Sequence, residues 1–295
     1  MPAVSIIIPT HDCARWLPES LDSVFAQTDA DYEVIVVDDG STDDTPDVLD
    51  RYAGRLTVVH GDHGGLGAAR NLGLARATGE WVAFHDADDV AMPDRIAWSR
   101  AFLRAHPEFD CVFGNGRHMP ADDPASPDVI SRRFVDATRG RTLNVTDLFE
   151  GFPLYFQGAL VPRAAFVAAG PFDAGFRVLT DLEYGYRLLP RVRAACADHT
   201  MFHYRRHDAN ITRDLLRMRL EVARTLERLP GVAPGAVESI GARRVRHRIA
   251  RQYYRIGIVQ LRRGERADAA DAFARAARLR PFHPRYRWMQ LRATG

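Results

Sequence analysis

The stretches VSIIIPT at residues 4–10, VIVVDD at residues 34–39 and VAFHDADD at residues 82–89 decide the fold of this chain. Each stretch opens with a short apolar run rich in β-branched or aromatic residues, which is typical of a buried strand. Each closes on proline or on acidic residues, which mark the end of a strand. The three stretches therefore predict three strands of one buried sheet.

The segments between these stretches have helical patterns. Apolar residues recur at helical spacing over residues 16–27 and 68–77, and Thr45 before Pro46 predicts an N-cap followed by a proline in the first turn. A further short strand is expected at residues 56–60. Strands that alternate with helices predict an α/β fold, a Rossmann-like, mainly parallel sheet with helices on both faces.

The pattern weakens over residues 110–145, which are rich in Pro, Asp and Arg and include PADDP at residues 120–124. We expect an irregular excursion there. Regular signals return at residues 159–167, and a helix is predicted around Leu182 and Tyr186.

The composition of the 295 residues excludes several kinds of chemistry. All 40 basic residues are arginine, so there is no Walker-A lysine, no Schiff-base lysine and no lysine of a receiver domain. The three cysteines are far apart and match neither a disulfide framework nor a metal-ligand spacing. No apolar run approaches the roughly 18 residues of a transmembrane helix, so we expect a cytoplasmic protein, with peripheral binding at the inner membrane face as the alternative.

Charge divides the chain into two expected domains. Residues 1–212 contain 20 arginines and 31 acidic residues, whereas residues 213–295 contain 20 arginines and 7 acidic residues. The split predicts an acidic, cation-using catalytic domain followed by a basic α-helical appendage, with helices over residues 214–229 and 236–249.

Acidic residues follow two of the predicted strands. Asp38 and Asp39 end one strand, and Asp86, Asp88 and Asp89 follow another. Ligands of open parallel sheets bind beyond the carboxyl ends of the strands, so these carboxylates should converge on one crevice. Clustered carboxylates repel one another unless a cation lies among them, and oxygen ligands favour a divalent metal.

Four ordered motifs, VSIIIPT, VVDDGST, GAARN and FHDADD, resemble those of the family 2 glycosyltransferases of GT-A fold, over residues 4 to about 208. The resemblance implies a nucleotide-sugar pocket that includes Pro9, Thr10 and Asp39. It also implies a D-x-D metal motif at Asp86 and Asp88, with Asp88 as ligand of Mg²⁺ or Mn²⁺ and Asp86 beside the donor.

The resemblance extends to residues outside these motifs. Asp181 in LTDLEY matches the family's general base at the start of a helix, and His207 in YRRH matches a histidine near the diphosphate or metal. Asp89 is a further candidate metal ligand. Arg70 follows a glycine-rich loop, and its planar guanidinium could contact a phosphate.

These residues predict an inverting transfer of a sugar, a UDP-hexose by resemblance, to the hydroxyl of a glycan or lipid-linked acceptor. A single positioned carboxylate suffices as the base of such a displacement. The alternative is a catalytically inactive sugar-nucleotide-binding or scaffold protein on the same fold. Residues 155–157 lie where the family's acceptor side begins and are not assigned individually.

Residues 250–283 match the pattern of one tetratricopeptide-like unit. A single repeat cannot bury its own apolar face, so residues 213–295 either brace the catalytic domain or contact a membrane or a protein partner. No nucleic-acid partner is expected, and the oligomeric state is left open.

Overall fold

The computed structural model describes residues 2–120, 123, 125–208 and 210–294. The chain forms two compact units, residues 1–207 and residues 208–295. The charge split instead suggests a boundary after residue 212.

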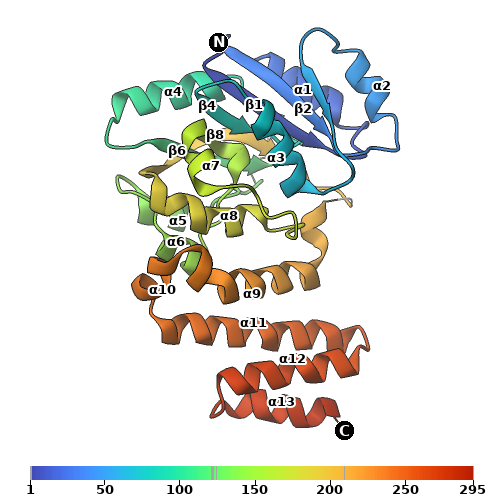
Figure 1. Ribbon diagram of the computed structural model, residues 1–295, viewed down its shortest axis with the longest axis vertical. Helices are drawn as coiled ribbons and strands as arrows, with labels where there is room; N and C mark the ends of the chain where they lie inside the picture. Colours follow the sequence, from blue (N-terminus) through green and yellow to red (C-terminus); the bar gives the residue numbers. More distant parts are fainter. Residues whose placement is uncertain (1, 121–122, 124, 209, 295) are drawn as a thin grey trace. The chain divides into compact units, whose positions relative to one another are not determined.

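The first unit is built on one eight-stranded mixed sheet, shown in Figure 1. The first four strands, β1 to β4, pair in parallel around β1, and the later strands extend the sheet through antiparallel pairs of β4 with β7 and of β7 with β6. The strands, in the order β3-β2-β1-β4-β7-β6-β8-β5, are β1 (Val4–Thr10), β2 (Tyr32–Asp38), β3 (Thr57–His60), β4 (Trp81–Phe84), β5 (Val90–Ala91), β6 (Cys111–His118), β7 (Ala159–Pro162) and β8 (Ala194–Tyr204).

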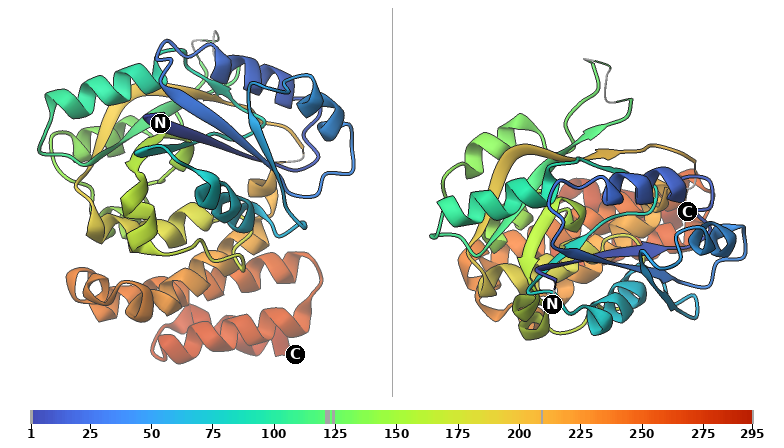
Figure 2. Two further views of the ribbon diagram at one scale, coloured as in Figure 1. Left: turned by 45° about the horizontal axis from the view of Figure 1, so that its top comes forward. Right: turned by 90° about the horizontal axis from the view of Figure 1, so that it is seen from above.

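Helices cover both faces of this sheet, as Figure 2 shows. Ile6 of β1 belongs to the core cluster that includes Leu17 and Leu21 of α1, whereas its neighbour Ile7 faces Gly73 of α3. This alternation follows from the two-residue period of a strand. The helices of the unit are α1 (Leu17–Phe25), α2 (Thr45–Asp50), α3 (Leu66–Arg76), α4 (Arg95–Ala105), α5 (Arg132–Thr138), α6 (Val145–Glu150), α7 (Arg163–Ala169) and α8 (Thr180–Leu188), with short 3-10 turns η1 (Phe156–Gly158) and η2 (Leu189–Arg191).

The predicted α/β, GT-A type fold class is thus confirmed, with two local corrections. Residues 110–145 are not irregular throughout, because β6 lies inside the sheet and α5 follows it; residues 121, 122 and 124 of the predicted excursion lie outside the described residues. The N-cap of α2 is Asp44 rather than Thr45. The Thr45 hydroxyl instead accepts a hydrogen bond of 3.0 Å from the backbone N–H of Cys13.

The second unit is α-helical, as expected for the appendage. Its elements are η3 (Ile211–Arg213), α9 (Leu215–Val232), α10 (Pro234–Ile240), α11 (Ala242–Arg262), α12 (Arg266–Leu279) and α13 (Pro284–Thr294). The predicted helix over residues 236–249 is wrong, because the chain turns at Gly241, whose φ of 93° is readily adopted only by glycine. Helix α11 packs on α9 and α12, and α12 packs on α13.

Helices α11 and α12 pack closely at Gly257, which lies against the aromatic ring of Phe273. A Cβ at Gly257 would lie 2.7 Å from the ring of Phe273, which is fully buried. No helix within the described ranges is long and apolar enough to cross a membrane.

Candidate active site

The loops after β1, β2 and β3 are joined through Asp39. The backbone N–H of Asp39 donates to the carbonyl oxygen of Thr10 at 2.9 Å. Its carboxylate accepts hydrogen bonds from the backbone N–H groups of Gly64, at 2.9 Å, and Gly65, at 2.6 Å. Pro9, Thr10 and Asp39 are all buried at this edge of the sheet. The three residues predicted to bind the nucleotide therefore lie together.

The backbone conformation at Gly65 favours glycine. Its φ is 87°, in the region that L side chains rarely adopt. A Cβ there would also lie 2.2 Å from Nη1 of Arg177, so that this side chain would have to move. The loop thus brings an arginine beside the residues that hold Asp39.

The acidic loop after β4 meets the segment that follows β8. His207 Nε2 lies 2.8 Å from Oδ2 of Asp88, and the imidazole stacks on Trp16 with ring centroids 3.9 Å apart. The side chains of Asp88 and His207 are 23% and 13% exposed, which leaves this carboxylate–imidazole pair accessible. The structure brings together the two residues that the motifs placed nearest to a metal.

Arg205 fixes the shape of the acidic loop. Its backbone N–H donates to Oδ1 of Asp89 at 2.7 Å, and its Nε donates to the carbonyl oxygen of Asp88 at 2.9 Å. Asp89 is fully buried, and burial, together with the charges of Asp88 and Asp86, raises the pKa of its carboxyl well above the usual value. Arg205 lies inside the YRRH element, but the motif alone gave no signal for these contacts.

Arg70 is buried in the interior of the site rather than on the surface, with 2% of its side chain exposed. Its Nη1 donates to Oδ1 of Asp181, and to the hydroxyl of Thr180 at 3.1 Å. Its Nη2 lies 3.8 Å from Oδ1 of Asp86. The guanidinium also lies 5.0 Å from the ring centre of Phe84. Arg70 therefore neutralises two of the predicted site carboxylates from within an aromatic setting.

Asp181 stands in the first turn of α8, where a carboxylate is favoured by the helix dipole. Its Oδ2 accepts a hydrogen bond of 2.9 Å from the backbone N–H of Phe156. Asn71 fastens the loop before α8 to α3, because its side-chain amide exchanges two hydrogen bonds with the backbone of Phe172, at 2.9 and 2.7 Å. The neighbouring Arg70 is thereby held opposite Asp181.

The electrostatics of the site reflect crowded negative charge. Burial and the negative charges of Asp88 and Asp181 raise the pKa of Asp86 to about 7, and the positive charge of Arg70 offsets part of this increase. His85, beside it in sequence, is fully buried, and burial together with the charge of Arg95 lowers its pKa to about 3. The imidazole of His85 is therefore neutral at physiological pH.

Within the described residues, no group of three or more His, Cys, Asp or Glu side chains is arranged to hold a metal ion. The pair of Asp88 and His207 supplies one carboxylate and one imidazole, whose side chains are 23% and 13% exposed. The carboxylate of Asp88 fits a Mg²⁺ or Mn²⁺ ion that completes its coordination with water and substrate phosphates, because these hard cations bind mainly oxygen ligands.

The sequence model described as "Glycosyl transferase family 2" matches residues 5–160, which is more than half of the chain. The chain belongs to this family. A relative of similar sequence is a "PGL/p-HBAD biosynthesis glycosyltransferase" of Mycobacterium tuberculosis, 34% identical over 191 residues, covering 63% of this chain and 69% of the relative.

Several solved structures resemble this chain in fold, although their sequence identity to it is lower than that of the mycobacterial relative. TarS of S. aureus has a TM-score of 0.69 at 17% identity, covering 98% of this chain but only 50% of TarS. Residues 1–349 of TarS have also been solved with UDP-GlcNAc. The mannosyltransferase PcManGT of Pyrobaculum calidifontis, solved with GDP-Man and Mn²⁺, has a TM-score of 0.63 at 21% identity, covering 99% of this chain and 84% of PcManGT. These likenesses show the family 2 fold.

Proposed function

We propose that this family 2 glycosyltransferase moves a hexose from a nucleotide-diphosphate sugar to an acceptor hydroxyl with inversion, assisted by a divalent metal. The observation that carries the proposal is the convergence of Asp181, Arg70 and Asp86, next to the pair of Asp88 and His207. This arrangement supports a role for one carboxylate as base and for the others in binding the diphosphate and its cation.

Asp181 is the proposed general base. Its carboxylate already accepts three protein hydrogen bonds, two at Oδ1 from Arg70 and the Thr180 hydroxyl and one at Oδ2 from the backbone N–H of Phe156. A carboxylate offers about four acceptor positions, and 20% of the side chain is exposed, so an acceptor hydroxyl can still bind it.

The proposed reaction is a single displacement. Asp181 takes the proton of the acceptor hydroxyl as the acceptor oxygen forms its bond to the anomeric carbon. The bond between that carbon and the diphosphate oxygen breaks, and its electron pair leaves with the diphosphate. A Mg²⁺ or Mn²⁺ ion held by Asp88 and His207 would neutralise the charge of the leaving diphosphate.

The donor side of the site is assigned to Pro9, Thr10 and Asp39, with Asp86 near the sugar and Arg70 toward the phosphates. In the structure Arg70 pairs with carboxylates, so we assign it the positioning of Asp181 in addition to the predicted phosphate contact. Asp89 remains a candidate metal ligand. UDP-hexoses are the first donors to test. The TarS complex contains UDP-GlcNAc, and the PcManGT complex contains GDP-Man.

The proposal is tested by measuring nucleotide release from UDP- and GDP-sugars with Mg²⁺, with Mn²⁺ and with EDTA. Asp181→Asn should lower turnover by about 10²-fold or more while the donor KM changes little. Asp47→Asn, which alters an exposed carboxylate in the first turn of α2, is the matched control and should keep full turnover.

Two outcomes would overturn the proposal. If every donor binds but none is consumed, the chain is a sugar-nucleotide-binding or scaffold protein. If Asp181→Asn abolishes donor binding yet retains turnover at saturation, Asp181 is a binding residue. The configuration of the product by NMR tests inversion separately.

A further inference from the structure

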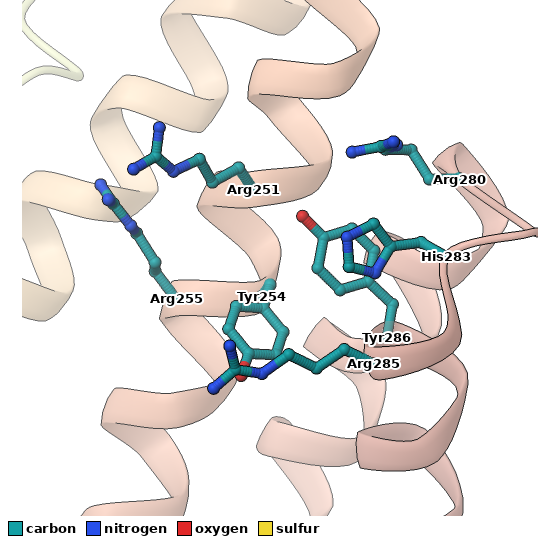
Figure 3. Close-up of a pocket in the computed structure, with 7 residues that line it drawn as sticks. All are labelled: Arg251, Tyr254, Arg255, Arg280, His283, Arg285 and Tyr286. Carbon is teal, nitrogen blue, oxygen red and sulfur yellow. The ribbon is translucent and has the colours of Figure 1, made fainter.

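The helical unit contains an open cleft of about 410 Å³, which Figure 3 shows between α11 and the segment that leads into α13. Its volume lies in the range of pockets that bind small ligands. Basic side chains dominate its walls, namely those of Arg251, Arg255, Arg280, Arg285 and His283.

The arginines of this cleft have no carboxylate partner in the part of the helical unit that the structure describes. Acidic residues of the unit pair elsewhere, as Glu227 does with Arg275. Burial and the charge of Arg251 lower the pKa of Arg255, which reflects repulsion between the two guanidinium groups. Such an arrangement favours an anion that enters from outside.

The aromatic residues of the cleft form a fixed frame for these charges. The rings of Tyr254 and Tyr286 stack with centroids 5.1 Å apart, and His283 stacks on Tyr286 at 3.8 Å. The guanidinium of Arg285 lies 5.4 Å from the ring centre of Tyr254. Because Tyr286 is buried, with 5% exposure, the frame is part of the helix packing. The frame therefore holds Arg285 and His283 before a ligand binds.

We propose that this cleft is a binding site for a phosphate- or diphosphate-bearing anion. Guanidinium groups bind phosphate oxygens through paired hydrogen bonds, and several converge here from α11 and from the segment around α13. The anion is either a soluble phosphate compound or the headgroup of a phospholipid. Phe282, directly before His283, is 94% exposed, and its ring would enter the bilayer if a lipid headgroup occupied the cleft.

The test uses the full-length protein and does not require donor or acceptor. Binding of inorganic pyrophosphate is measured by calorimetry, and binding to phosphatidylcholine vesicles with and without phosphatidic acid is measured by flotation. Arg251→Gln with Arg280→Gln should weaken pyrophosphate binding by at least about tenfold, the scale of one lost charge-assisted contact. Arg262→Gln with Arg278→Gln removes the same charge from exposed positions outside the cleft and should leave the affinity within about twofold.

Both double variants are first compared with the parent protein by thermal unfolding, and hydrogen exchange checks whether pyrophosphate protects α11 and α13. Phe282→Ala distinguishes the two sources: loss of vesicle binding with unchanged pyrophosphate affinity indicates a lipid headgroup, and unchanged vesicle binding indicates a soluble anion. Equal loss in the cleft and control variants, or absence of protection in α11 and α13, would overturn the site. Nucleotide release from a donor should be unaffected by the cleft substitutions.

Discussion

Substituting Arg70 with methionine is expected to destabilise the catalytic unit strongly. The change removes a guanidinium that is 2% exposed, leaving Asp181 and Asp86 without their shared cation. Breaking a buried ion pair from one side costs about 3–5 kcal/mol. The carboxylate of Asp181 is 20% exposed, so water can replace part of the lost interaction. We therefore expect a loss of about 3 kcal/mol in the free energy of unfolding, measured by urea denaturation.

The control for this prediction is Arg187→Met in α8. Arg187 forms two hydrogen bonds, of 3.0 and 2.8 Å, with the carboxylate of Glu183, and these side chains are 13% and 3% exposed. Its loss should destabilise the unit by a similar amount. Because the pair contains none of the proposed site residues, turnover per folded molecule should be retained in Arg187→Met and lost in Arg70→Met.

A double-mutant cycle decides whether the effect of Arg70 acts through Asp181. Asp181→Asn removes the charge that Arg70 neutralises, so the double variant should be more stable than the sum of the two single effects predicts, by about 1–3 kcal/mol. Additive effects, or a loss below about 1 kcal/mol for Arg70→Met alone, would refute the reasoning.

Three further predictions concern separate parts of the chain. Asp88→Asn should abolish the stimulation of nucleotide release by Mg²⁺ or Mn²⁺. The unfolding midpoint should change little, because the carboxylate is 23% exposed. Metal titrations of nucleotide release check this, and full stimulation in the variant would remove Asp88 from the site. Gly257→Ala should cost about 1–3 kcal/mol, because the new methyl group would lie 2.7 Å from the ring of Phe273; an unchanged urea midpoint would contradict this. Burial and the charge of Asp88 raise the pKa of Cys13 to about 12, so its thiol should resist iodoacetamide at pH 8 until the protein is unfolded, as followed by mass spectrometry.

Local sequence was sufficient to predict the first half of the catalytic unit. The strands predicted within residues 4–10, 34–39, 56–60 and 82–89 are β1 to β4, because apolar β-branched runs bounded by proline and acidic residues specify strands without help from distant contacts. The same reasoning failed over residues 110–145. There the alternation in β6 is interrupted by glycines, and its pairing with β8 comes from a segment about 80 residues later.

The motifs also predicted which acidic and basic residues belong to the site. They did not predict which of these residues form hydrogen bonds or ion pairs with one another. Arg70 and Asp181 are 111 positions apart, and Asp88 and His207 are 119 apart. The sequence suggested a phosphate ligand for Arg70, but only the packing of α3 against the loop before α8 buries its guanidinium among aromatic rings and carboxylates. Strand and helix formation depends on neighbours along the chain, and the sequence by itself determined it. The pairing of charges depends on which side chains are desolvated together, and only the tertiary structure decided that.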